Sequence, residues 1–168
     1  PLFIEYKGKE NAKNAFESGT GGYGYNAAYI GGTPYSNPFP KSNRIATMNT
    51  RIYNPANTIM FADTALPQKG YVIEYGFVTP PYFPTPDHPK GNKDWGLAAP
   101  SIHFRHYGRA NVLWADGHIT SEKIEWTTNE NVYKGNNLRY GIGWFGPQNN
   151  SLFDVTDRGT YIQDSDTD

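Results

Sequence analysis

Three histidines and two aspartates are the residues of this sequence whose types suggest chemistry. His103, His106 and His118 are potential zinc ligands, with Asp63 or Asp116 as a fourth. Protein zinc sites of this kind usually carry paired cysteines or an H-E-x-x-H helix. The 168-residue chain has no cysteine and lacks that helix motif. A metal-dependent hydrolase is therefore the least favoured of the three functions that we consider for this chain.

His106 and Asp116 also suggest an acid–base dyad, but their spacing argues against it. Nine residues separate them, and the extended strand expected for Arg109–Ala115 spans about 20 Å at ~3.3 Å per residue. The two side chains should then lie near opposite ends of one strand. We expect structural roles instead, in which Asp116 sets a turn and His106 hydrogen-bonds into a neighbouring loop.

The strongest local pattern is a β-hairpin around Asp116-Gly117. The run Ala110–Ala115 is apolar apart from one asparagine, which predicts a strand buried on both faces. His118–Ile124 is the expected partner strand. Asp-Gly between two such runs predicts a two-residue type I′ turn with positive φ at both positions.

The rest of the sequence predicts short strands, long loops and little helix. The 18 glycines and 13 prolines disfavour long regular elements. We therefore predict one α+β domain over residues 1–168, built on an antiparallel sheet with long Pro/Gly-rich loops. The expected short helix is Lys7–Phe16. The further expected strands are Thr58–Ala62, Tyr71–Val78 and Leu138–Trp144. The expected long loops are Tyr25–Arg44 and Thr79–Lys93.

Three segments resemble a known family. His106 is followed by nine residues and then by Asp116-Gly117, which resembles the H-x9-D-G signature of the prepilin-type, processing-associated proteins, a pseudopilin-like family. Gly22–Ala28 and Asn54–Ala65, the latter containing Asp63, are similar to two further segments of that family. They occur in the family's order, and the resemblance covers about residues 22–124.

The resemblance implies a structural, non-catalytic subunit of a type II secretion pseudopilus or a type IV pilus-like assembly. Its globular head would lie outside the cytoplasm, in the periplasm or at the cell surface, and its partners would be other pilin or pseudopilin subunits. Attachment to the membrane would come through an N-terminal apolar helix that this sequence does not contain. We expect the gene to encode that helix, with a short leader, upstream of Pro1.

The acidic end of the chain is a second place where an ion could bind. Residues 154–168 are rich in aspartate, and Asp164, Asp166 and Asp168 are spaced two apart, as in the first half of a calcium loop. The glycine and the distal glutamate of an EF-hand are missing. A solvated tail is the alternative. Asp154 and Asp157 are the candidate calcium ligands, because they lie nearer the folded body.

Aromatic residues make up 15% of the chain and leave a second function open. Trp95 and Trp144 lie among glycine and proline, where exposed rings are expected to bind either sugars or another protein. Trp114, within an apolar strand, is expected in the core. A secreted carbohydrate-binding module is therefore the alternative function. The formal net charge of -1 provides no basic surface for nucleic acid.

Overall fold

A computed structural model of the chain describes residues 22–31, 47–85 and 87–157. Within these ranges it contains eight short strands and three single-turn 3₁₀ helices. The strands are β1 Tyr23–Tyr25, β2 Ile59–Asp63, β3 Leu66–Gln68, β4 Tyr71–Ile73, β5 Ile102–His103, β6 Arg109–Trp114, β7 Ile119–Lys123 and β8 Ile142–Gly143, and the 3₁₀ turns are η3 Asn49–Arg51, η4 Pro55–Asn57 and η5 Lys93–Trp95.

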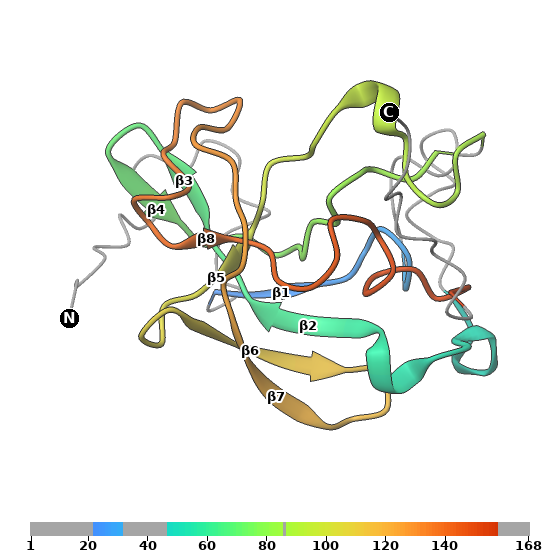
Figure 1. The fold of residues 1–168 in the computed structure, drawn as a ribbon. Helices are drawn as coiled ribbons and strands as arrows, with labels where there is room; N and C mark the ends of the chain where they lie inside the picture. The colour runs from blue at the N-terminus through green and yellow to red at the C-terminus, as the bar shows by residue number, and fades with distance from the viewer. Residues whose placement is uncertain (1–21, 32–46, 86, 158–168) are drawn as a thin grey trace.

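The principal sheet has four antiparallel strands in the order β1-β2-β6-β7 (Figure 1). Two-stranded antiparallel pairs, β3-β4 and β5-β8, lie beside it. The prediction of an antiparallel, β-rich fold with little helix is therefore confirmed for the described residues. The predicted helix Lys7–Phe16 lies outside them, so the α component of the predicted α+β class stays a prediction.

The hairpin predicted around Asp116-Gly117 is present, but its turn differs from the prediction. Leu113 pairs with Ile119, and the N–H of Trp114 donates to the carbonyl of His118. The loop therefore contains three residues, 115–117. Only Gly117 in this loop has a positive φ, of 95°, so the two-residue type I′ turn was wrong. A three-residue loop that ends in a left-handed glycine is the next commonest way to close a hairpin.

Strand β6 is buried on one face, not on both as its apolar sequence predicted. Its inward residues Ala110, Val112 and Trp114 are buried, whereas Arg109 and Asn111 are exposed on the other face. The outer-face residues Arg109 and Asn111 are in contact with solvent. An antiparallel sheet commonly has one solvated face. The continuous apolar run gave no sign of this, because it lacks the alternation of apolar and polar residues that usually marks such a strand.

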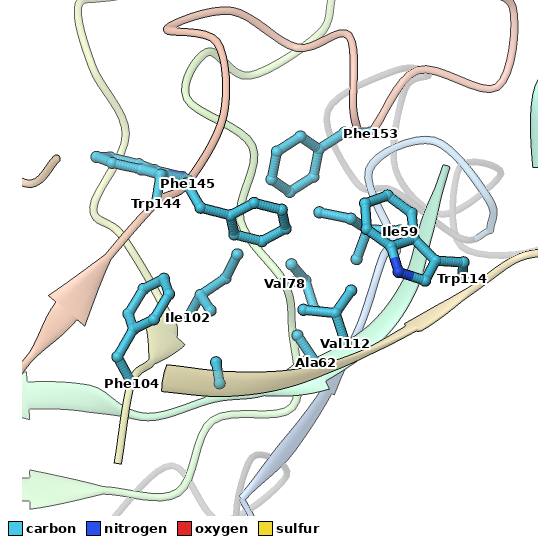
Figure 2. Close-up of a cluster of buried hydrophobic side chains, with 11 residues drawn as sticks. Ile59, Ala62, Val78, Ile102, Phe104, Val112, Trp114, Trp144, Phe145 and Phe153 are labelled. Carbon is cyan, nitrogen blue, oxygen red and sulfur yellow. The ribbon is translucent and has the colours of Figure 1, made fainter. Parts of the chain in front are cut away.

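The core lies against the inner face of the principal sheet and is rich in aromatic rings. Figure 2 shows Trp114, Phe145 and Phe153 converging on the aliphatic side chains Ile59 and Val112. Phe145 meets Trp114 edge-to-face with ring centroids 6.2 Å apart. Such aromatic pairs stabilise a core beyond the area that they bury.

Two predicted strands are shorter than the sequence suggested. The run Tyr71–Val78 forms a strand only over β4, and Leu138–Trp144 contributes only β8. The predicted strand Thr58–Ala62 corresponds to β2, shifted by one residue. The β3-β4 hairpin was missed because β3 contains Pro67, which a two-stranded sheet accommodates at its edge.

The proline-rich segment 79–93 contains no strand, as predicted, but it is not entirely a surface loop. Pro80, Pro81 and Pro84 are buried, and the carbonyl of Thr79 accepts a hydrogen bond from the indole Nε1 of Trp144 at 2.9 Å. The prolines therefore contribute apolar surface to the interior while interrupting regular hydrogen bonding.

Where the main chain is irregular, buried asparagine side chains supply the hydrogen bonds that a β-sheet would otherwise provide. Asn150 accepts from the N–H of Tyr82 at 3.0 Å and donates to the Tyr82 carbonyl. Asn131 donates to the Pro67 carbonyl and accepts from two N–H groups of its own loop. Buried main-chain polar groups require partners, and an amide side chain supplies both donors and an acceptor.

Helices long and apolar enough to cross a bilayer are absent from the described ranges.

Candidate functional site

Asp63, at the end of β2, is the centre of the main polar cluster. Its side chain is completely buried. One carboxylate oxygen, Oδ1, accepts a hydrogen bond from the guanidinium of Arg105. The other, Oδ2, accepts from the main-chain N–H of Asn111 at 2.7 Å and lies 3.2 Å from Nε2 of His106. A buried carboxylate is stable only with such compensation.

The turn that precedes β6 brings two of these partners to Asp63. His106 and Arg109 exchange main-chain hydrogen bonds of 2.9 and 3.1 Å, which close a tight turn. Arg105 enters the cluster from one side of that turn, and it also donates to the Gly22 carbonyl and lies over the ring of Tyr23. The cluster therefore joins β1, β2 and the start of β6.

The structure separates His106 from Asp116, as their spacing predicted. His106 precedes β6 and contacts Asp63, while Asp116 follows β6 in the hairpin loop. The carboxylate of Asp116 instead accepts from the N–H of His118 at 3.1 Å and lies 2.6 Å from the His118 ring Nδ1. These hydrogen bonds from His118 lower the pKa of Asp116.

Asp116, His118 and Trp114 form a compact arrangement around the hairpin loop. The imidazole of His118 stacks on the indole of Trp114, with centroids 5.7 Å apart. The indole Nε1 in turn donates to Thr120 Oγ1 at 2.8 Å. Asp116 and its neighbours thus fix the loop by local hydrogen bonding and stacking.

His103 occupies a third, separate environment in β5. Its side chain is almost completely buried. Burial disfavours the charged imidazolium and lowers the pKa of His103 to about 4, with a further lowering by the Arg105 guanidinium that the Asp63 carboxylate opposes. His103 is therefore neutral at pH 7.

The three histidines proposed as zinc ligands are thus divided among different surroundings: the interior at His103, the Asp63 cluster at His106, and the hairpin loop at His118. In the described part of the chain, no three His, Cys, Asp or Glu side chains gather as a possible metal site.

The two candidate calcium ligands, Asp154 and Asp157, are both buried. Asp154 Oδ1 accepts hydrogen bonds from the main-chain N–H and the hydroxyl of Thr156, each 2.8 Å long. This carboxylate oxygen therefore helps to shape the local turn. The acidic residues from 158 onward lie outside the described residues.

The two candidate binding tryptophans differ in exposure. Trp95 is 62% exposed in η5, whereas Trp144 is 1% exposed and stacks on Trp126 with centroids 4.4 Å apart. The expectation of an exposed Trp144 was wrong, because a buried carbonyl, that of Thr79, satisfies its indole N–H. Trp114 is buried, as expected.

Sequence reasoning missed two features of these sites. Arg105 and Asn111 gave no signal as partners of Asp63, because they lie 42 and 48 residues away in the sequence. Tyr107 was also missed, although Tyr107-Gly108 forms the two-residue turn with positive φ at both positions that was expected at Asp116-Gly117.

Comparison with known proteins gave no match to a family model, to a curated protein or to a solved structure.

Proposed function

We propose that this chain is the extracytoplasmic head of a pseudopilin-like subunit, a non-catalytic component of a pseudopilus or a type IV pilus-like assembly. Its partners are other subunits of that assembly. In this proposal the polar residues of the H-x9-D-G segment maintain the shape of the head.

The observation that carries the proposal is the convergence of the three resembling segments on one sheet. Gly22–Ala28 contributes β1, Asn54–Ala65 contributes β2, and the segment from His106 to Ile124 contributes β6 and β7. Asp63 pairs with Tyr23 of β1, and its carboxylate contacts His106 and the main-chain N–H of Asn111. Three segments that together build one sheet favour a role that depends on the shape of the head.

The contacts made by the Asp63 carboxylate favour a structural role over catalysis. Both oxygens of Asp63 are engaged by Arg105, Asn111 and His106. A general base needs a free lone pair within reach of the substrate proton. The carboxylate of Asp63 is buried behind these donors, so its geometry suits the support of β1, β2 and β6.

The complete reading frame tests the proposal. We expect a short leader and an apolar helix of about 20 residues or more upstream of Pro1. Expression of that full chain should place the head in the cell-envelope fraction, in high-molecular-weight assemblies. A conventional cleavable secretion signal directly before Pro1, with release of a free monomer, would contradict the proposal.

A secreted carbohydrate-binding module remains the second candidate because of the exposure of Trp95, beside which Leu97 is 44% exposed. Saturable binding on a glycan array, abolished by Trp95→Ala and retained by Trp126→Phe, would favour this candidate. An assembly head should show no such binding.

A further inference from the structure

The turn before β6 presents a tyrosine in an unusual conformation. Tyr107 has φ of 56° and Gly108 has φ of 79°, the geometry of a type I′ turn. Glycine, asparagine and aspartate are the usual residues at such positions, and a bulky side chain there is strained. Tyr107 is 99% exposed, so side-chain packing of Tyr107 within the described residues does not compensate for this strain.

Two cations lie beside this turn on the outer face of the sheet. Arg109 and Lys123 stand directly opposite each other across β6 and β7, and both are exposed. Like charges at facing positions of a sheet destabilise it. Among the described residues neither has a carboxylate partner, and the Arg109 guanidinium instead donates to the Ser121 carbonyl at 2.7 Å.

An exposed tyrosine next to two cations that lack a carboxylate partner among the described residues is suited to an acidic protein segment. Tyrosine and arginine are the residue types that most often dominate protein–protein contacts. The Asp63 cluster holds the base of the turn in place, which reduces the ordering cost of binding. A phosphate-rich polymer is less suitable, since the chain as a whole carries a formal charge of -1.

The chain itself contains a segment of the required chemistry. Residues 158–168 read RGTYIQDSDTD and place Asp164, Asp166 and Asp168 within five positions, after Tyr161 and Ile162. The segment has three carboxylates against one cation, Arg158, and its net negative charge and two apolar side chains complement two cations and an exposed ring.

The described end of the chain lies at the opposite end of the sheet from Tyr107. The carbonyl of Leu152 accepts from the N–H of Ile59, which faces Trp114 at the far end of β6. Six residues of β6, about 20 Å at ~3.3 Å per residue, separate the two ends. Figure 1 shows the same arrangement, with the turn before β6 and the red end of the chain on opposite sides.

We propose that the turn at Tyr107, with Arg109 and Lys123, binds the acidic segment 158–168 of a second copy of this chain. This contact rests on the proposed function and specifies how subunits would meet. The turn and the last described residue, Asp157, belong to different ends of the sheet, so a contact between the turn of one copy and the following segment of another is heterologous and can continue from copy to copy in an open filament.

Complementation between two variants tests this contact in the 168-residue chain. The turn variant combines Tyr107→Asn with Lys123→Gln, and the tail variant combines Asp164→Asn, Asp166→Asn and Asp168→Asn. The matched control is Lys69→Gln, an exposed lysine in the β3-β4 turn. Sedimentation velocity over a concentration series measures self-association.

The wild-type and Lys69→Gln chains should self-associate, and increasing salt should weaken the association. Each variant alone should associate about tenfold more weakly or worse. A mixture of the two variants should form dimers but no larger species, since only one intact contact remains per pair. The turn variant should melt no lower than wild type, because asparagine suits the left-handed position.

Monomeric wild-type chain at all concentrations, or variants that associate as strongly as wild type, would overturn this contact. A mixture in which the two variants form no dimers with each other would also overturn it, because the tail would then bind the turn of its own chain. The upstream reading frame tests the proposed function separately. An apolar helix encoded upstream of Pro1, together with a monomeric head, would refute this contact but not the proposed function.

Discussion

At the scale of single residues, burial determines the protonation state of His103. Its pKa falls to about 4 from an ordinary value of 6.5, mainly because burial disfavours the charged ring. The folded chain therefore binds fewer protons than the unfolded chain between these two pH values. Stability that is fully present above pH 6.5 is lost as the pH falls toward 4.

We predict that the free energy of unfolding decreases by about 3 kcal/mol from pH 7 to pH 4 because of His103. Urea titrations across this pH range measure the decrease. His103→Asn retains a short amide donor and removes the titrating ring, so it should flatten the profile. An equally steep profile in His103→Asn would assign the dependence to other groups.

At the scale of elements, the three-residue loop of the β6-β7 hairpin depends on the left-handed conformation of Gly117. A Cβ at Gly117 would meet no atom within 4 Å, so the cost of a substitution lies in the backbone and not in a clash. Gly117→Val should reduce the free energy of unfolding by about 1–3 kcal/mol. Thermal melting measures this loss.

Asp116→Asn is the matched change in the same loop. Asparagine retains an oxygen that can accept the hydrogen bond from the N–H of His118. This variant should melt within a few degrees of wild type and remain folded. A Gly117→Val variant as stable as wild type, or an unfolded Asp116→Asn variant, would show that the loop is held in another way.

Loops of this fold are held by asparagine side chains, and Asn150 is the clearest example. It hydrogen-bonds the main chain of Tyr82 in both directions and also donates to the Tyr29 hydroxyl. Asn150→Ala leaves buried polar groups without partners and should reduce the unfolding free energy by about 2 kcal/mol or more.

Asn150→Asp tests the direction of these hydrogen bonds at almost constant volume. It replaces the amide donor with an acceptor that faces the Tyr82 carbonyl, so it should destabilise the fold at least as much as alanine at neutral pH. Guanidinium unfolding compares the two variants. An Asn150→Asp chain as stable as wild type would contradict this role.

At the scale of the whole molecule, local signals predicted the hairpin but not the long-range pairing. The apolar run Ala110–Ala115 and the Asp-Gly loop indicated β6 and β7 within two residues, because these elements are adjacent in sequence. The pairing of β5 with β8 joins residues about 40 positions apart over two residues each. No local pattern encodes so short and distant a contact.

The candidate site was partly predictable for the same reason. Spacing alone separated His106 from Asp116, since an extended strand has a known length. The partners of Asp63 lie across strands, so only the fold brings them together. Trp144 was misassigned because its neighbours are glycine and proline, whereas its burial depends on Thr79 and Trp126.

The central claim is that the polar residues of the H-x9-D-G region and Asp63 hold the sheet together. A double-mutant cycle between Asp63→Asn and Arg105→Gln, measured by urea unfolding, tests it most directly. We predict a coupling energy of about 1–3 kcal/mol for this pair, and close to zero between Asp63→Asn and the remote Lys69→Gln. Single variants as stable as wild type, with no coupling between Asp63 and Arg105, would contradict the claim.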